Sequence, residues 1–202
     1  EGRDLIEGRG GVDTLLGGLG DDSLVGGAQG DLLDGGDGTD AADYRGSAQA
    51  VTVSLADGTA LGGDAQGDTL VSIENLNGSD LDDQLTGNDD GNRLDGGRGA
   101  DTLLGGLGDD TLSGGRGADI LRGGDGVDIA DYTFSLDGVR VDMADGASGG
   151  GDAEGDTFED IEIVQGSYYG DTILGSDADN ILRGGRGADV LDGRGGFDTA
   201  DF

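Results

Sequence analysis

The chain has 202 residues, a formal net charge of −33, 48 glycines, and no proline, cysteine, histidine or tryptophan. This composition excludes a disulfide scaffold, and it excludes a nucleic-acid-binding module because phosphates need Lys and Arg as partners. No apolar run is long enough to cross a membrane and no signal-peptide pattern occurs, so we expect no membrane insertion. A Gly-rich, acidic chain poor in aromatic residues is a candidate for disorder unless a regular pattern opposes that default.

Such a pattern recurs in three blocks. Its clearest stretch, residues 96–122, reads GGRGADTLL, GGLGDDTLS and GGRGADILR, or Gly-Gly-x-Gly-x-Asp-x-Leu-x. A period this strict predicts one small unit, here called a row, that is stacked on itself. We predict blocks at 1–43, 78–131 and 166–202, with Asp at the sixth position of a row and an apolar residue at the eighth. The chain starts and stops inside this pattern, so we expect it to be part of a longer array.

Two inserts, 44–77 and 132–165, separate the blocks and align with each other without a gap. In both, a short alternating run matches: Val51-Thr52-Val53 in the first and Val139-Arg140-Val141 in the second. We predict that the inserts form short strands that continue or cap the stack, as architecture and not as binding sites. The first two rows after each insert depart from the pattern, and we call them adapter rows: 78–86, 87–95, 166–174 and 175–183.

Each residue type in a row has a structural task. Gly at positions one, two and four permits positive φ and close backbone approach, as a tight turn requires. The three residues after the Asp predict a short strand whose middle side chain points inward. One row then reverses the chain once, so eighteen residues make a coil, and successive coils stack as parallel strands about 4.8 Å apart. We therefore predict an all-β fold, a parallel β-roll (β-solenoid) with 18 residues per coil.

This stacking places each sixth-position Asp beside the Asp eighteen residues later. At about 4.8 Å, two carboxylates repel by roughly 3.5 kcal/mol with an effective dielectric of 20. A hard dication would reverse the sign of this interaction. Ca²⁺ accepts six to eight oxygen ligands including backbone carbonyls, whereas Mg²⁺ demands tighter octahedral geometry. Zinc and copper prefer His or Cys, which the chain lacks. We therefore expect several calcium ions to bind and to drive folding.

The nonapeptide resembles the RTX (repeat-in-toxin) family of calcium-binding parallel β-rolls. The resemblance implies that each ion lies between two turns one coil apart. Carbonyls come from positions two and four of one turn and one and three of the next, and both Asp side chains join them. In regular rows the implied ligands are Arg9, Gly11 and Asp13 with Gly26, Ala28 and Asp31; Gly18, Gly20 and Asp22 with Gly35, Asp37 and Asp40; Gly97, Gly99 and Asp101 with Gly114, Arg116 and Asp119; and Gly106, Gly108 and Asp110 with Gly123, Asp125 and Asp128.

The same resemblance implies further sites that begin in the adapter rows. Their ligands would be Ser79, Leu81 and Asp83 with Gly96, Arg98 and Asp101; Asn92 with Gly105, Leu107 and Asp110; Ser167, Tyr169 and Asp171 with Gly184, Arg186 and Asp189; and Asn180 with Gly193, Gly195 and Asp198. Because Asn92 and Asn180 lack the formal charge of Asp, we expect the sites that use them to be weaker or empty.

Two groups of insert residues have their own interpretation. A shared Asp-x₃-Asp-x₅-Glu spacing could ligate a further calcium ion or could be ordinary surface charge: Asp64, Asp68 and Glu74, and Asp152, Asp156 and Glu162. We expect the aromatic residues at the block ends to plug the end of a roll: Tyr44, Tyr132 and Phe202.

The chain has no HExxH motif and no histidine, so we predict no catalytic residues and no organic cofactor. The family resemblance implies a calcium-binding module of a large secreted bacterial protein that folds outside the cell after type I secretion. Repeated block-plus-insert units favour a surface or biofilm adhesin whose other parts contact cell-surface or matrix polymers. The alternative is an accessory module of an RTX enzyme such as an alginate epimerase, protease or lipase. An ice-binding solenoid would need a flat outward array of Thr, which the rows interrupt.

Overall fold

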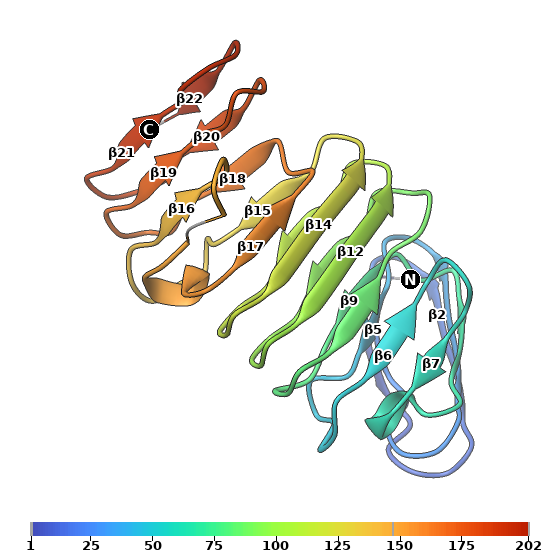
Figure 1. Cartoon of the computed structure of the whole chain (residues 1–202). Coiled ribbons are helices and arrows are strands. Elements are labelled where there is room, and N and C mark those ends of the chain that lie inside the picture. Colours follow the sequence, from blue (N-terminus) through green and yellow to red (C-terminus); the bar gives the residue numbers. More distant parts are fainter. Residues whose placement is uncertain (1, 147, 202) are drawn as a thin grey trace.

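The computed structural model describes residues 2–146 and 148–201, which form an elongated stack of short strands (Figure 1). Strands one coil apart pair in parallel, as Leu103 with Leu121. In the described residues the remaining regular elements are two 3₁₀ helices, η1 (Gly63–Ala65) and η2 (Gly151–Ala153). None of these described helices is long and apolar enough to cross a membrane. The predicted all-β parallel roll is therefore confirmed.

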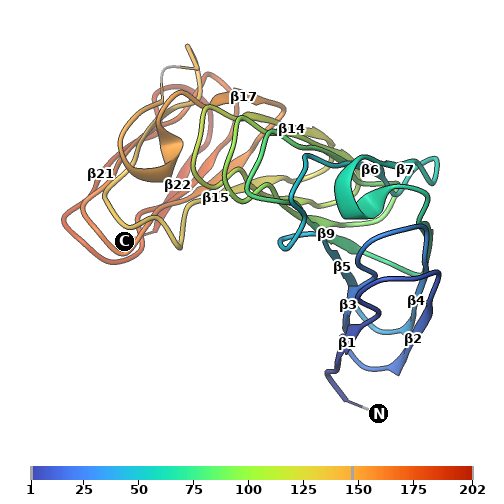
Figure 2. The ribbon, with the colours of Figure 1, turned by 90° about the horizontal axis from the view of Figure 1, so that it is seen from below.

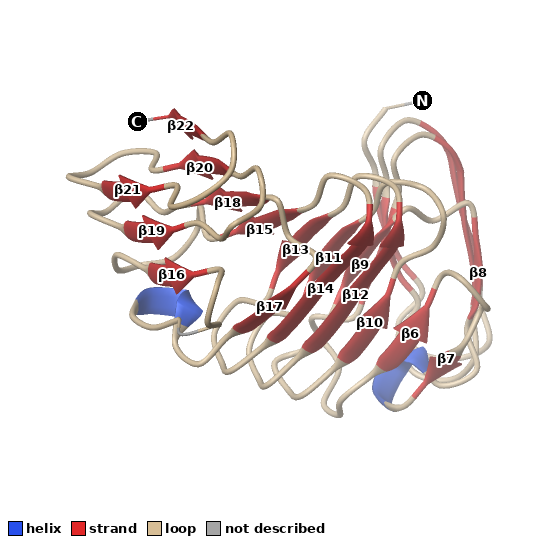
Figure 3. Ribbon diagram, turned by 45° about the horizontal axis from the view of Figure 1, so that its top comes forward, coloured by secondary structure: helices blue, strands red, loops and turns tan. Residues whose placement is uncertain are grey.

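One face of the roll, here the continuous face, is a single parallel sheet that runs through all blocks and both inserts (Figure 3). Within the described chain its strands in spatial order are β1 (Leu5–Glu7), β3 (Ser23–Val25), β5 (Ala41–Asp43), β9 (Asn75–Asn77), β11 (Arg93–Asp95), β13 (Thr111–Ser113), β15 (Ile129–Asp131), β18 (Ile163–Gln165), β20 (Ile181–Arg183) and β22 (Thr199–Asp201).

The opposite face, here the divided face, consists of separate sheets in the described residues. The first holds β2 (Thr14–Leu19), β4 (Leu32–Asp37) and β8 (Thr69–Val71). The second holds β7 (Ala60–Leu61), β6 (Thr52–Ser54), β10 (Gln84–Thr86), β12 (Thr102–Leu107), β14 (Ile120–Asp125) and β17 (Thr157–Glu159). The third holds β16 (Arg140–Asp142), β19 (Thr172–Leu174) and β21 (Val190–Asp192).

Each insert reverses the order of two strands on the divided face. After β5 the chain passes forward to β6, which pairs with β10 of the next block. It then returns through η1 to β8, which pairs with β4 of the preceding block, and β9 resumes the continuous face. The second insert does the same with β16 and β17. Each insert thus adds the first strand of the next block to the divided face before it adds the last strand of the preceding block. Figure 2 shows the stack bending at the first insert.

The core is a single file of side chains from the eighth position of each row. Each three-residue strand points only its middle side chain inward, so the roll buries one large apolar residue per row. The large, fully buried side chains of this file are Leu24, Leu33, Leu85, Leu94, Leu103, Leu112, Leu121, Ile173 and Leu182, joined by Leu76 of the insert strand β9; the smaller Ala42 and Ala130 are also fully buried. A core this thin leaves the turns to supply much of the remaining stabilisation.

Candidate metal-binding turns

The turns of the rows stack along two edges of the roll. Turns of the first edge, such as 105–110, lead into the continuous face, and turns of the second edge, such as 96–101, lead into the divided face. Along each edge the sixth-position side chains form a ladder of hydrogen bonds. The Asp110 N–H donates to Asp128 Oδ1 at 2.8 Å on the first edge. The Asp101 N–H donates to Asp119 Oδ1 at 2.8 Å on the second edge.

The second carboxylate oxygen of these aspartates has no hydrogen-bond partner. Among the described residues, a buried and unpartnered Oδ2 occurs in Asp13, Asp22, Asp31, Asp40, Asp101, Asp110, Asp119 and Asp128. These are the aspartates of the predicted sites within regular rows, where both members of each pair carry such an oxygen. A buried carboxylate oxygen without a partner is strongly unfavourable and calls for an ion or a proton in the site.

Backbone carbonyls converge on the same oxygens. A methyl group added at Gly105 would overlap both Asp110 Oδ2 and the carbonyl oxygen of Gly123 in the next coil. Glycine is therefore required there, because it lets a carboxylate and a carbonyl of successive coils approach one point. This all-oxygen donor set suits calcium. The described residues hold no cluster of three or more acidic, His or Cys side chains around one point, in keeping with sites built from two carboxylates and several carbonyls.

Electrostatics of the metal-free turns favour a bound positive charge. Burial, followed by the charges of neighbouring aspartates, raises the pKa of Asp101 to about 8. Burial likewise raises the pKa of Asp110 and of Asp119 to about 6. A raised pKa means that the ionised carboxylate is disfavoured in the metal-free turn, and a bound cation would favour it again. The turns are therefore built to accept either protons or a metal ion.

In the adapter rows the sixth-position side chain is satisfied within its own turn. The Ser167 N–H donates to Asp171 Oδ2 at 2.7 Å, and the Asn88 N–H donates to Asn92 Oδ1 at 2.7 Å. Ser79 and Ser176 bond in the same way to their sixth-position partners. Asp83, Asn92, Asp171 and Asn180 thus contribute no unpartnered oxygen, and the predicted sites that start from them differ from those in regular rows.

The cause lies at position two of the row. Regular rows have a residue with positive φ there, as Gly97 at 96° and Gly106 at 120°. Ser or Asn occupies this position in the adapter rows without positive φ, and its N–H faces the side chain that would bind the ion. The Ser or Asn in place of the second Gly is the sequence signal for this difference.

The two insert tyrosines donate hydrogen bonds to aspartates of the second-edge ladder. Asp68 accepts the Asp31 N–H at 2.8 Å through Oδ1, so it is the next rung after Asp31. Its Oδ2, the oxygen that is unpartnered in regular rows, accepts the Tyr44 hydroxyl at 3.1 Å. Asp156 and Tyr132 repeat this arrangement at 2.6 Å. Both tyrosines are buried where a block meets its insert, although the continuous face runs on past them and does not end there; Phe202 lies outside the described residues.

The insert carboxylates do not assemble into one site. Asp68 lies on the second edge with Tyr44, whereas Glu74 lies on the first edge, where it accepts the Asp40 N–H at 2.8 Å. The second insert repeats the separation with Asp156 and Glu162. A single calcium site with the Asp-x₃-Asp-x₅-Glu ligands is therefore wrong, because Asp68 precedes β8 and Glu74 follows it, and the two ends of this strand lie at opposite edges of the roll.

Comparison with known proteins agrees with this geometry. A family model described as the RTX calcium-binding nonapeptide repeat (4 copies) matches residues 1–24, 7–42, 77–112, 104–131 and 165–200. No match was found among curated proteins. The matched segments cover more than half of the chain and contain every aspartate with a buried, unpartnered oxygen. The chain therefore belongs to the family of RTX calcium-binding nonapeptide-repeat proteins.

Proposed function

We propose that this chain is a non-enzymatic module that folds when it meets extracellular calcium, as part of a large bacterial surface or biofilm adhesin exported by type I secretion. Proteins with RTX repeats are typically secreted and bind calcium. The observation that carries the proposal is the set of buried carboxylate oxygens without partners along both edges. These oxygens disfavour the folded state until a cation arrives, so calcium controls folding.

Magnitudes support a calcium-controlled switch. If a site has a dissociation constant near 10 μM, millimolar calcium adds about 2.7 kcal/mol to the free energy of unfolding. A few such sites together reach the total stability of a typical domain, about 5–15 kcal/mol. At the much lower free calcium inside a cell the same sites contribute almost nothing. The chain would then cross the membrane unfolded and fold outside.

Circular dichroism tests the proposal. The full chain in EDTA at pH 8 should give a coil spectrum, and 10 mM calcium should convert it to a β spectrum, whereas 10 mM magnesium should do so much less. A β spectrum that is the same with EDTA and with calcium would refute calcium-driven folding. An accessory module of an RTX enzyme would behave identically in this assay, so the sequence that flanks the chain in its parent gene distinguishes the two parents.

A further inference from the structure

Each insert contains a shortened turn on the first edge. In the strand register Val71 is level with Asp34 and Asn75 is level with Ala41, so only Ser72, Ile73 and Glu74 stand where the preceding coil has the six residues 35–40. Between β17 and β18 the corresponding turn is 160–162. No nonapeptide match covers either turn. The two turns have the same length and sit at equivalent places, directly after the last regular turn of a block.

The glutamate of each shortened turn continues the first-edge ladder. The Asp40 N–H donates to Glu74 Oε2 at 2.8 Å, and the Asp128 N–H donates to Glu162 Oε2 at 2.9 Å. These bonds replace the Asp-to-Asp bonds of regular rows, such as Asp110 to Asp128. The extra methylene of Glu spans the distance that the shorter backbone leaves. A carboxylate thus follows Asp40 and Asp128 at the place where a regular row has its next Asp.

The converging oxygens of a regular site also recur at these turns. Asp40 is fully buried and its Oδ2 has no partner. A methyl group added at Gly35 would overlap both Asp40 Oδ2 and the Ser72 carbonyl oxygen. The pairing is the same as that of Asp110 Oδ2 with the Gly123 carbonyl in a regular row.

The second insert repeats the arrangement with different residues. Asp128 is fully buried with an unpartnered Oδ2, and a methyl group at Gly123 would overlap both this oxygen and the Asp160 carbonyl oxygen. Ser72 and Asp160 are not glycines, yet their φ angles are 49° and 52°. This strained conformation, kept by two different side chains at matching positions, directs the carbonyl toward the buried Asp.

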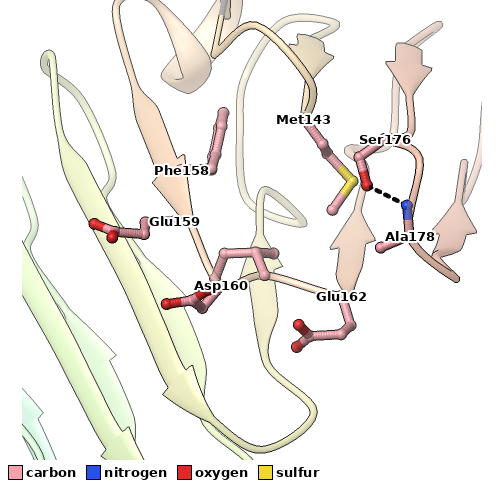
Figure 4. Close-up of a pocket in the computed structure, with 8 residues that line it drawn as sticks. Met143, Phe158, Glu159, Asp160, Glu162, Ser176 and Ala178 are labelled. Carbon is pink, nitrogen blue, oxygen red and sulfur yellow. Dashed lines mark hydrogen bonds between the residues drawn. The ribbon is translucent and has the colours of Figure 1, made fainter.

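A cavity gives solvent access to each shortened turn. Because the turn lacks three residues, the edge has a notch of about 220 Å³ beside Asp160 and Glu162 (Figure 4). An equivalent cavity of about 210 Å³ lies beside Ser72 and Glu74. Met143 lines the first notch, and Leu55 lines the second at the equivalent place. The lining of each cavity thus includes the glutamate of the shortened turn and the residue whose carbonyl faces the buried Asp, but not the buried Asp itself.

We propose that each shortened turn completes a further calcium site, closed by a glutamate of the insert. The ligands are Asp40 Oδ2, the Ser72 carbonyl and the Glu74 carboxylate in the first insert. In the second insert they are the equivalent atoms of Asp128, Asp160 and Glu162. The proposal rests on calcium binding by the regular rows and extends it to a part of the chain outside the nonapeptide. The inserts then contribute ligands, and the ion ties each insert to the block that it completes.

Counting bound calcium in a double variant tests the proposal. Glu74→Gln combined with Glu162→Gln keeps an oxygen acceptor for both ladder bonds but removes both charges. The control, Asp57→Asn combined with Asp145→Asn, removes the same charge from the loop after β6 and β16. At free calcium ten times the wild-type midpoint, equilibrium dialysis with atomic emission should find two ions fewer per chain in the Glu variant and no change in the control.

An equal ion count in wild type and the Glu variant would overturn the inference while leaving calcium binding by the regular rows intact. A wild-type chain that binds no calcium would instead refute the proposed function. If circular dichroism shows that the Glu variant has lost β structure, its number of bound calcium ions does not test the insert sites. Wild-type crystals grown in calcium then give the test. Anomalous scattering should place an ion between Asp40 and Ser72 and another between Asp128 and Asp160, and the lack of both peaks would overturn the inference.

Discussion

Replacing Asp110 by Asn separates ion binding from hydrogen bonding in the ladder. Asp110 is fully buried, its Oδ1 accepts the Asn92 N–H at 2.7 Å, and its Oδ2 has no partner. An Asn in the same rotamer keeps the oxygen that accepts the N–H. It replaces Oδ2 with an amide group that cannot ligate a cation. Asp110→Asn therefore preserves the ladder and removes one anionic ligand from the predicted site shared with Asp128.

Asp110→Asn should raise the free energy of unfolding without calcium and lower it with calcium. Burial raises the pKa of Asp110 to about 6, so keeping this carboxylate ionised at pH 8 in the metal-free roll costs at most about 3 kcal/mol, and less once solvent screens the charge. Asp110→Asn removes that cost and should raise the free energy of unfolding in EDTA by about 1–3 kcal/mol, since the unpaired amide offsets part of the gain. In 1 mM calcium the variant should lose about 2.7 kcal/mol if the site binds near 10 μM.

Urea denaturation followed by circular dichroism at pH 8 measures both values. The EDTA arm contains trimethylamine N-oxide, which favours the folded metal-free state. Asp89→Asn is the control, because Asp89 is an exposed acid of the same block and its loss changes the net charge equally. Calorimetric titration of Asp110→Asn should also find one calcium ion fewer. Equal destabilisation with and without calcium, or behaviour like that of Asp89→Asn, would refute the role of Asp110 as a ligand.

Further predictions concern a tyrosine, pH and the core. Tyr132→Phe leaves Asp156 Oδ2 without its donor and should lower the unfolding free energy in calcium by about 1–3 kcal/mol in urea melts, whereas Tyr168→Phe, at an exposed residue, should change it little. In EDTA, circular dichroism should show more β structure at pH 5 than at pH 8. Burial raises the pKa of Asp101 in the folded state to about 8. The stability that its protonation gives to the folded state is therefore complete below the ordinary Asp pKa and is lost as the pH rises toward 8. A spectrum independent of pH in EDTA would contradict this. Leu112→Ala, in the fully buried file, should lower the unfolding free energy in saturating calcium by about 2–5 kcal/mol.

The sequence predicted those parts of the fold that depend on period and local residue type. A strict nine-residue row determines the length of the coil, the inward side chain such as Leu103, and the pairing of Asp101 with Asp119. It could not predict the exchange of strands at the inserts. Residues 52–54 and 69–71 have similar short, β-branched patterns, and nothing local to either strand decides which block it joins.

In the candidate sites, too, the sequence predicts what depends on neighbouring residues and misses contacts between residues on different turns. The regular rows repeat every nine residues, so the sequence alone identifies the aspartates whose buried oxygens have no partner. The bond from Tyr44 to Asp68 joins residues on different turns, and it exists only because the insert folds back onto the preceding block. Sequence spacing groups Glu74 with Asp64 and Asp68, whereas the fold places it beside Asp40.

The strand exchange at the inserts determines where such an array can be cut or lengthened. Because β6 joins the following block and β8 the preceding one, a break within 44–77 would leave both neighbours with an incomplete divided face. A break between two regular coils of a block exposes only the edges of short strands, which another coil of the same register can cover. The unit that recombination could duplicate, delete or transplant intact therefore starts and ends in the middle of a block and carries a whole insert at its centre.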